Sequence, residues 1–306
     1  MELLFSPYTL VKKNNQGVQK GSLIRVSDGE NFGVADLCPK VELGDSNLLD
    51  QITKNGSLFL RAQQLAYEDL SARKNKKSLL LDKPVKNNFL ITDYQKLILS
   101  DLKSLQGRFG SLSIKIKGDK DIKSLLTYLN SNFAEPTLDC KLRLDFNAKL
   151  SPTEFEFFLN SLSELIVNKI EYIEDPTIIS PEWAIWNQRV PLAIDFQKTE
   201  NSDYFKYKIL KPAREFVPEN LNNFTLTSAM DHPVGVAHGL SLAQKMSQND
   251  SGFLTLDLYE DCGFNKYYNQ DELFLNFSKL ALNDFGIGMT EEIKKLNWVT
   301  LDRMSN

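Results

Sequence analysis

Apolar residues follow two different patterns along the chain, and the change between them falls near residue 88. Beyond that point, short apolar runs alternate with segments of helical period. We predict strands at residues 89–92, 112–117, 142–147, 169–174, 192–195, 207–211, 224–228 and 253–258. Strands that alternate with helices form parallel sheets, and eight such strands are enough to close a barrel. The pattern therefore predicts an α/β barrel over this part of the chain.

Two of the intervening helices have clear start signals. Ser151 and Glu154 form a capping box with Pro152 at the first helical position, and an apolar stripe follows. Asp121 precedes a second stripe in the same way. By contrast, the ten residues between Asp195 and Lys206 are polar and aperiodic, and the segment between Lys211 and Phe224 is only slightly longer. A full crossover helix does not fit there, so we expect the barrel to be trimmed on this side.

The first 87 residues follow a different pattern. Two short apolar runs at residues 23–26 and 32–35 flank a turn sequence with glycine at its centre, which predicts a β-hairpin. Apolar residues at helical spacing then predict a helix at residues 57–74. The opening of the chain is therefore expected to form a small α+β unit.

Composition narrows the class of protein. The chain has 306 residues, of which 42% are hydrophobic and 25% charged, with a net charge of −4, the profile of a soluble protein. No basic stripe favours nucleic acid, and no apolar run is long enough to cross a membrane. The three cysteines are far apart and predict no disulfide, and the start of the chain does not resemble a signal peptide. We expect a cytoplasmic protein.

Charged side chains stand at the ends of five successive predicted strands. Residues two apart on a strand share a face, and the carboxyl ends of barrel strands are where catalytic groups lie. One acidic residue ends each of three neighbouring strands, and lysines end the strands on either side. The candidate residues in chain order are Lys115, Lys117, Arg143, Asp145, Asn147, Glu174, Asp195 and Lys211.

This set of residue types supports one kind of chemistry. Carboxylates from adjacent strands provide the hard oxygen ligands that Mg²⁺ prefers, so Asp145, Glu174 and Asp195 are candidate metal ligands. A metal there can stabilise the negative charge that builds up when a carbon next to a carboxylate loses its proton. The lysine that accepts this proton must be neutral, a form that nearby cations favour.

Each feature alone has an ordinary explanation, because K-x-K is common on solvated strands and a strand-end aspartate often caps a helix. The occurrence of all these groups together, in this order at the ends of five successive strands, outweighs those explanations. Asp231-His232-Pro233 is a separate candidate, since a histidine beside an aspartate can act in acid–base catalysis. No nucleophile motif accompanies it, and we expect His232 to be a loop or cap residue.

The ordered set resembles the enolase superfamily and, within it, the muconate lactonizing enzyme subgroup. Lys115-Ile116-Lys117, Asp145, Glu174, Asp195 and Lys211 stand where that subgroup has its lysines and metal ligands. The resemblance implies a modified TIM barrel of the (β/α)7β type at residues 88–263 and an N-terminal α+β capping domain at residues 1–87, joined by the C-terminal segment 264–306. It also implies Mg²⁺, with Mn²⁺ as an alternative.

Further motifs resemble the o-succinylbenzoate synthase family within this superfamily. They are Arg143-Leu144-Asp145-Phe146-Asn147, the segment Thr227-Ser228-Ala229-Met230, and the segment that begins at Gly252. The resemblance implies that Lys117 and Lys211 are catalytic, that Lys115, Arg143 and Asn147 support them, and that Ser228 and Gly252 hold the substrate's succinyl end. The implied reaction is the syn dehydration of 2-succinyl-6-hydroxy-2,4-cyclohexadiene-1-carboxylate to 2-succinylbenzoate in menaquinone biosynthesis.

Two other functions stay open on this sequence. The same scaffold serves N-acylamino acid or dipeptide racemases, epimerases and cycloisomerases, because a family fold does not determine the substrate. A barrel that binds a carboxylate without catalysis is a more remote alternative, since binding alone does not require two lysines. In each case the partner is a small-molecule carboxylate, with no nucleic acid, membrane or specific protein partner implied.

Overall fold

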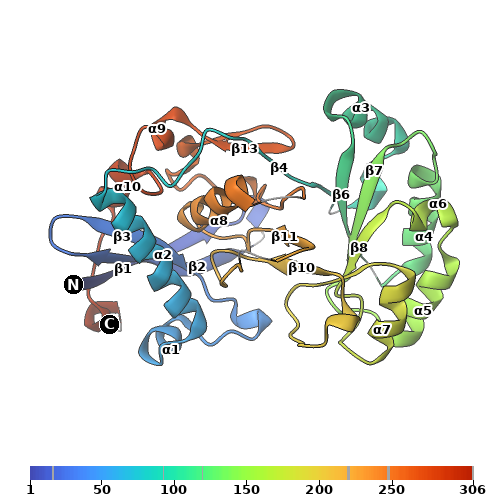
Figure 1. The fold of residues 1–306 in the computed structure, drawn as a ribbon, viewed down its shortest axis with the longest axis horizontal. Helices are drawn as coiled ribbons and strands as arrows, with labels where there is room; N and C mark the ends of the chain where they lie inside the picture. Colours follow the sequence, from blue (N-terminus) through green and yellow to red (C-terminus); the bar gives the residue numbers. More distant parts are fainter. Residues whose placement is uncertain (16, 92, 119, 219–220, 247–248, 305–306) are drawn as a thin grey trace. The chain divides into compact units, whose positions relative to one another are not determined.

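The computed structural model describes residues 1–15, 17–91, 93–118, 120–218, 221–246 and 249–304, which form two compact units (Figure 1). The first unit comprises Met1–Asn87, Leu210–Leu221 and Thr225–Asn306. The second comprises Asn88–Ile209 and Asn222–Phe224. The boundaries given above for a capping domain and a barrel domain stay a prediction.

A parallel sheet forms the centre of the second unit. Its strands lie side by side in sequence order, and the sheet order continues to β10 and β11, where the boundary between the units runs. Neighbouring strands from β5 to β10 pair in parallel. The strands are β5 (Phe89–Ile91), β6 (Leu112–Lys117), β7 (Cys140–Asp145), β8 (Ile170–Glu174), β9 (Leu192–Ile194), β10 (Tyr207–Leu210) and β11 (Phe224–Leu226).

Seven of the eight predicted strands are thus confirmed in place. The strand expected at residues 142–147 starts and ends two residues earlier, as β7. Thr92, the expected last residue of the first strand, lies outside the described residues. Because the strands from β5 to β10 run in parallel, their carboxyl ends meet at one edge of the sheet. The predicted candidate residues at the ends of β6, β7, β8 and β9 therefore lie along that one edge.

Helices connect the strands of the second unit, and their predicted start signals are confirmed. They are α3 (Leu99–Phe109), α4 (Ile122–Phe133), α5 (Pro152–Ser161), α6 (Glu164–Val167) and α7 (Glu182–Arg189), with a 3-10 turn at Tyr94–Lys96. Ser151 forms the capping box of α5 with Glu154, and Asp121 caps α4 through Ser124. In the described chain between β9 and β10, the 3-10 turn Ser202–Tyr204 is the only helical element, which confirms the trimmed crossover.

The prediction of an eighth strand at residues 253–258 is wrong. Residues 256–258 form a 3-10 turn, and Ser251 and Gly252 make only isolated bridges to Asn87 and Thr227. The N–H of Phe253 donates to the side-chain oxygen of Asn87 (2.7 Å), and the N–H of Thr255 turns back onto the carbonyl of Phe253 (2.7 Å). At Phe253, the side chain of Asn87 therefore takes the place of the expected backbone pairing. The alternation of apolar residues along the sequence does not reveal such a contact.

An antiparallel sheet and a long helix form the core of the first unit. The strands β1 (Glu2–Val11), β2 (Val18–Ser27) and β3 (Phe32–Leu37) form a meander, and Ser27 pairs with Phe32 across the predicted hairpin. The helix α2 spans Ser57–Lys74 as predicted. Its apolar face and the sheet bury a common cluster that includes Phe5, Ile24 and Leu65. Burial of such side chains stabilises each by about 1.5–3 kcal/mol.

The rest of the first unit consists of short elements around one further long helix, α8 (Pro233–Met246). A second small sheet has the strand order β12-β13-β4. Its strands, together with short helices and 3-10 turns, make up the remaining elements of the unit. These elements are Lys13–Asn15, Val41–Leu43, α1 (Leu48–Thr53), β4 (Val85–Lys86), Asn265–Tyr267, β12 (Tyr268–Gln270), β13 (Phe274–Phe277), α9 (Lys279–Leu282), α10 (Thr290–Lys295) and α11 (Leu301–Met304).

Two buried carboxylates meet at the N-terminus of α8. Asp36 accepts hydrogen bonds from the hydroxyl of Tyr8 (2.6 Å) and the backbone N–H of His232 (2.9 Å). A Cβ at Gly235 would lie 2.8 Å from an oxygen of Asp36 and from the Cβ of Asp231, so only glycine allows this approach. Burial, and then the charge of Asp231, raise the pKa of Asp36 to about 7.

His232 has the cap role expected of it. Its carbonyl accepts the N–H of Val236 (3.0 Å), and its Nδ1 accepts the N–H of Val234 (3.1 Å). Its ring packs against the rings of Tyr8 (4.7 Å between centroids) and Phe264 (4.9 Å). Burial lowers the pKa of His232 to about 3, so the imidazole is neutral near pH 7. A neutral, enclosed ring that caps a helix is part of the packing of this unit.

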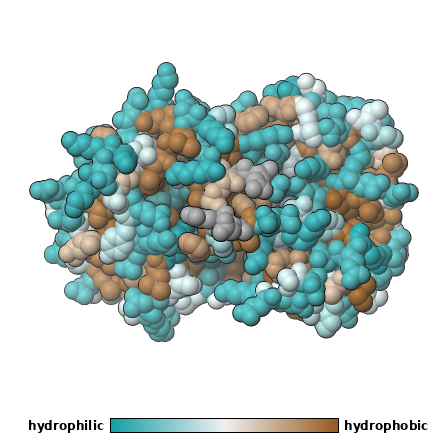
Figure 2. Space-filling model, viewed as in Figure 1, coloured by the Kyte–Doolittle hydropathy of each residue, from teal (hydrophilic) through white to brown (hydrophobic). Residues whose placement is uncertain are grey.

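Figure 2 shows that hydrophilic residues cover most of the face in view and that apolar residues form separate patches. Within the described ranges, no helix is both long enough and apolar enough to cross a bilayer.

We predict that Gly33→Ala destabilises the first unit. A Cβ at Gly33 would lie 2.0 Å from the carbonyl oxygen of Ala66 and 2.3 Å from the nitrogen of Leu70, so β3 and α2 would have to separate. Such overpacking costs about 1–3 kcal/mol. Urea unfolding followed by circular dichroism measures the loss. Gly107→Ala is the control, because a Cβ at this α3 residue meets nothing within 4 Å and should stabilise the helix slightly. Equal stability of G33A and the unchanged protein would contradict this packing.

We also predict a pH-dependent effect of Asp36→Asn. The pKa of Asp36 is about 7 in the folded protein and about 3.9 when unfolded, so the folded state holds this proton more tightly. That contribution is fully present below about pH 4 and is lost as pH rises through 7. The D36N variant has no carboxyl group to titrate at this position, so it does not lose this contribution to stability over the same pH range. Its free energy of unfolding, relative to the unchanged protein, should therefore rise by about 2.5 kcal/mol between pH 5 and pH 8.

Asp28→Asn is the control for D36N. Hydrogen bonding to the backbone at Asn31 lowers the pKa of Asp28, so its titration falls below this pH range. The difference between D28N and the unchanged protein should stay constant from pH 5 to pH 8. A similarly flat difference for D36N would show that Asp36 titrates normally.

Candidate active site

Three candidate side chains lie in one row across the sheet of the second unit. Lys117 on β6 pairs with Asp145 on β7, and Asp145 pairs with Glu174 on β8. Residues two positions earlier form the row beneath, because Lys115 pairs with Arg143 and Arg143 with Tyr172. All six side chains project from the same face, since they alternate in step along parallel strands. The strand register alone therefore brings the predicted lysines and two predicted ligands together.

The ammonium group of Lys115 holds the two carboxylates. Its Nζ lies 2.7 Å from Oε2 of Glu174 and 3.0 Å from Oδ2 of Asp145. The Nζ of Lys117 lies 3.5 Å from the same oxygen of Asp145. The two carboxylates are almost fully buried, whereas 45% of the Lys117 side chain is exposed. Lys117 is thus the group of this set that a small molecule can reach most easily.

Mutual attraction keeps these groups charged despite their burial. Burial acts to raise the pKa of Asp145, but Lys115 and then Lys117 outweigh it, so this pKa lies below its ordinary value. Burial acts to lower the pKa of Lys115, but Glu174 and then Asp145 outweigh it and raise this pKa well above the usual range. Lys115 is therefore a permanent cation here, which suits a supporting role and not that of a proton acceptor.

Arg143 forms the floor beneath the row. Its Nε donates to Oε2 of Glu171 (2.6 Å), and its Nη1 lies 3.4 Å from Oδ1 of Asn88. The guanidinium also covers the ring of Tyr172, 5.1 Å from the centroid. Arg143 is 1% exposed, so its contacts lie within the protein. Sequence reasoning missed Glu171 and Asn88, because both contacts join segments that only the fold brings together.

The turns that follow the strands hold the rest of the rim. The N–H of Asn147 donates to Oδ1 of Asp145 (3.2 Å), so Asn147 contacts the candidate ligand through its backbone. The N–H of Asp195 donates to Oδ2 of Asp175 (3.3 Å). Burial, and then the charge of Glu174, raise the pKa of Asp175 to about 7. Asp175 was not among the predicted residues, although it directly follows Glu174 in the Glu174-Asp175-Pro176 motif.

The donor set fits a hard divalent cation in its chemistry. Two anionic oxygens, from Asp145 and Glu174, already converge on one positive charge, the ammonium of Lys115. In the part of the chain that the structure describes, no three His, Cys, Asp or Glu side chains are grouped closely enough to hold an ion as they stand. The structure thus brings together two of the three predicted ligands. Asp195, at the end of the next strand, is the third predicted ligand.

Three further candidates belong to the first unit. Lys211 follows β10, and its N–H donates to Oε1 of Glu215 (2.9 Å). The hydroxyl of Ser228 donates to Asp231 (3.0 Å), and its N–H donates to the carbonyl of Gly252 (2.9 Å). The proposed roles of Lys211, Ser228 and Gly252 stay predictions.

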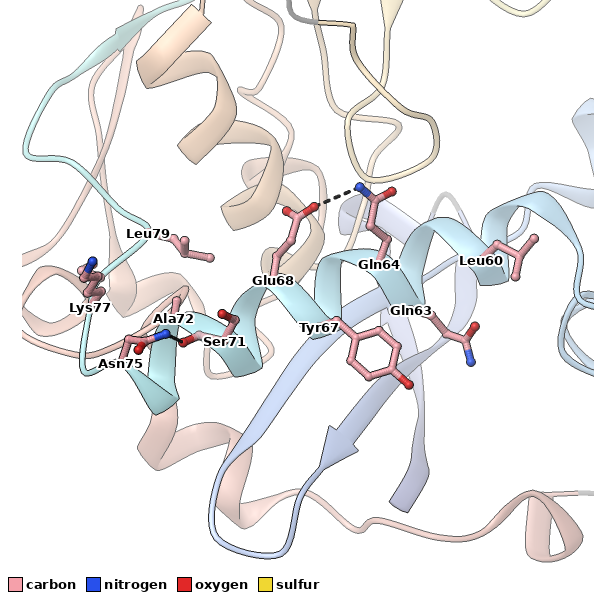
Figure 3. Close-up of a pocket in the computed structure, with 11 residues that line it drawn as sticks. Leu60, Gln63, Gln64, Tyr67, Glu68, Ser71, Ala72, Asn75, Lys77 and Leu79 are labelled. Carbon is pink, nitrogen blue, oxygen red and sulfur yellow. Dashed lines mark hydrogen bonds between the residues drawn. The ribbon is translucent and has the colours of Figure 1, made fainter. Parts of the chain in front are cut away.

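A shallow groove of about 830 Å³ runs along α2 in the first unit (Figure 3). One face of α2 and residues 77–79 line it. Its carboxylate, Glu68, accepts a hydrogen bond from Gln64 (3.0 Å), and Asn75 donates to the carbonyl of Ser71 (2.7 Å). The groove contains none of the charged clusters seen at the strand ends. We therefore place the candidate active site in the second unit.

We predict that Lys115→Met strongly destabilises the protein when EDTA is present. The change would leave two buried carboxylates without their shared cation, which costs about 3–5 kcal/mol. Lys141→Met is the control, because this β7 lysine is 62% exposed and its ion pair with Glu171 is long (3.6 Å). Such an exposed pair contributes about 1 kcal/mol or less. Urea unfolding measures both, and equal losses in the two variants would contradict the assigned role of Lys115.

Comparison with known proteins gives a consistent picture. No protein-family model matches the chain. The curated o-succinylbenzoate synthase of Bdellovibrio bacteriovorus is 29% identical in an alignment that covers 98% of this chain and 99% of that protein. A mandelate racemase/muconate lactonizing protein from Herpetosiphon aurantiacus matches in structure with a TM-score of 0.73 at 14% identity, covering 94% of this chain and 97% of that one.

A second solved structure carries a more specific name. It is the o-succinylbenzoate synthase from Thermosynechococcus elongatus BP-1, complexed with Mg in the active site. It matches with a TM-score of 0.65 at 16% identity, covering 85% of this chain and 95% of that one. A further match is a member of the enolase superfamily from Roseovarius nubinhibens. The chain therefore has the fold of the enolase superfamily, a modified TIM barrel with an N-terminal α+β capping domain.

Proposed function

We propose that this protein is an o-succinylbenzoate synthase. It would dehydrate 2-succinyl-6-hydroxy-2,4-cyclohexadiene-1-carboxylate to 2-succinylbenzoate, a step of menaquinone biosynthesis. The observation that carries the proposal is the row of Lys117, Asp145 and Glu174, with Lys115 between the two carboxylates. The similarity to a curated o-succinylbenzoate synthase over nearly the full length of both chains adds the substrate.

The residues of this row would hold Mg²⁺, with Mn²⁺ as an alternative. Asp145, Glu174 and Asp195 would be its ligands, and the ion would act as a Lewis acid toward the substrate's ring carboxylate. The solved synthase that contains Mg in its active site supports this choice for a protein of the same fold. Oxygen ligands on neighbouring strands suit Mg²⁺ better than softer metals.

Lys117 would carry out both proton transfers. It is the exposed lysine of the row, and its amine would take the proton from the carbon next to the ring carboxylate. The ammonium group that results would then donate a proton to the departing hydroxyl, which leaves as water. Because one residue acts twice, the proton and the hydroxyl leave from the same face of the ring. Lys115, whose ammonium lies between the two carboxylates, projects from the same strand in the row beneath.

Lys211 would act from the opposite face of the ring. It would stay protonated and lie over the ring, a cation–π contact that holds the substrate in place. Arg143 and the backbone of Asn147 support the carboxylate row from below and from the rim. Ser228 and Gly252 would hold the succinyl end of the substrate. The product is aromatic, and aromatisation supplies much of the driving force.

We predict that turnover requires both the metal and Lys117. EDTA should abolish formation of 2-succinylbenzoate, and excess Mg²⁺ should restore it. Lys117→Ala should reduce kcat by at least about 10³-fold, because the variant loses both proton transfers, while its affinity for Mg²⁺ stays close to that of the unchanged protein. Absorbance of the aromatic product measures turnover, and Lys123→Ala on the exposed face of α4 is the control.

The same assays separate the competing functions. Racemisation of N-acylamino acids or dipeptides without any dehydration would favour the racemase alternative. Failure to exchange the substrate's α-proton with solvent deuterium, together with tight binding, would favour a non-catalytic carboxylate-binding protein. Full dehydration activity in K117A would remove Lys117 from the mechanism.

A further inference from the structure

Asp175 is a buried carboxylate at the candidate site that the mechanism does not use. It follows β8 directly, next to the candidate ligand Glu174, and is 1% exposed. Its φ of 39° lies in the left-handed region, which few residues other than glycine, asparagine and aspartate adopt. A backbone conformation of this kind persists where surrounding contacts enforce it.

The side chain of Asp175 binds the backbone at the end of the next strand. Its Oδ2 accepts the N–H of Asp195 (3.3 Å) and the N–H of Phe196 (3.2 Å). Its Oδ1 accepts the side-chain amide of Gln197 (3.2 Å). Three consecutive residues, beginning with the candidate ligand Asp195, are therefore attached to one carboxylate.

The backbone of Asp175 joins the strands on both sides. Its carbonyl accepts the N–H of Ala148 (2.6 Å), just beyond the end of β7, and its N–H donates to the carbonyl of Ala193 (3.0 Å) on β9. One residue thus connects the ends of the three strands that supply Asp145, Glu174 and Asp195.

Gln197 forms a second, independent attachment of the same segment. Its amide also donates to the carbonyl of Thr177 (2.9 Å), and its oxygen accepts the N–H of Ile179 (2.8 Å). Thr177 is in turn fixed by Trp183, whose Nε1 donates to its hydroxyl (2.9 Å). The segment that begins at Asp195 is therefore fixed against the loop after β8 at two points.

We propose that Asp175 is a positioning residue for metal binding. It acts through hydrogen bonds to the backbone of Asp195 and Phe196, which set the direction in which the Asp195 side chain leaves the sheet. The inference rests on the proposed function, because it takes Asp195 as a ligand. Its rival is a purely electrostatic effect, in which the charge of Asp175 attracts the cation and the hydrogen bonds are incidental. The two differ in what a neutral acceptor at this position does.

Calorimetric titration of the full chain with Mg²⁺ alone tests the proposal. Asp175→Gly removes the carboxylate while glycine accepts the positive φ, and it should raise the Kd at least 10-fold. Asp175→Asn removes the charge but keeps one oxygen that can accept both N–H groups, and its Kd should stay within about 3-fold. Thr177→Val, which removes the acceptor for Trp183, should lower the Tm without changing the Kd. Asp145→Asn should abolish binding.

Other results would overturn the proposal. Equal losses in D175N and D175G would leave the charge as the cause, and an unchanged Kd in D175G would leave Asp175 without a role. If D175G does not fold, Asp175→Ser, whose hydroxyl is too short to reach both N–H groups, takes its place with the same expectation. If D145N binds Mg²⁺ as well as the unchanged protein, the metal site and the proposed function fail together. If D145N loses Mg²⁺ binding but D175G does not, only the positioning role of Asp175 is refuted.

Discussion

The arrangement of the candidate site depends on one constraint: two buried carboxylates on neighbouring strands need a cation between them. Asp145 and Glu174 lie opposite each other in the strand register, and both are almost fully shielded from water. Left alone, like charges so placed would repel each other and one would bind a proton. The ammonium of Lys115 forms an ion pair with both carboxylates, and its charge holds the pKa of Asp145 below its ordinary value. A site that must hold anionic oxygens together is also a site suited to a divalent metal.

The sheet turns this local constraint into a possible active site. Parallel strands place their carboxyl ends at one edge, and a shared register sets Lys117, Asp145 and Glu174 in one row. Beneath them, Arg143 is held by Glu171 and by the ring of Tyr172, so its guanidinium is fixed in place. Proton abstraction next to a carboxylate requires an exposed base beside an electrophilic centre, and this arrangement of lysine and carboxylates suits that reaction.

Much of the fold could be predicted because its signals are local. The capping box at Ser151, the hairpin turn before Phe32 and the apolar face of α2 each depend on a few neighbouring residues. The strand-end residues could be predicted as a set, because alternation determines which side chains share a face. The contacts that could not be predicted join distant segments. In one of them the side chain of Asn87 takes the place of the backbone pairing expected at Phe253, and in another Asp175 binds the backbone at Asp195. The same limit hid Lys115 as the cation shared by both carboxylates.

Anomalous diffraction from crystals grown with Mn²⁺ tests the central claim most directly. Manganese can replace magnesium at oxygen sites, and its anomalous signal locates the ion without reference to the protein. The account predicts one strong peak within about 2.3 Å of carboxylate oxygens from Asp145, Glu174 and Asp195, with the Nζ of Lys115 displaced from between the first two. A strong peak elsewhere, or no peak with Lys115 still bridging both carboxylates, would contradict it.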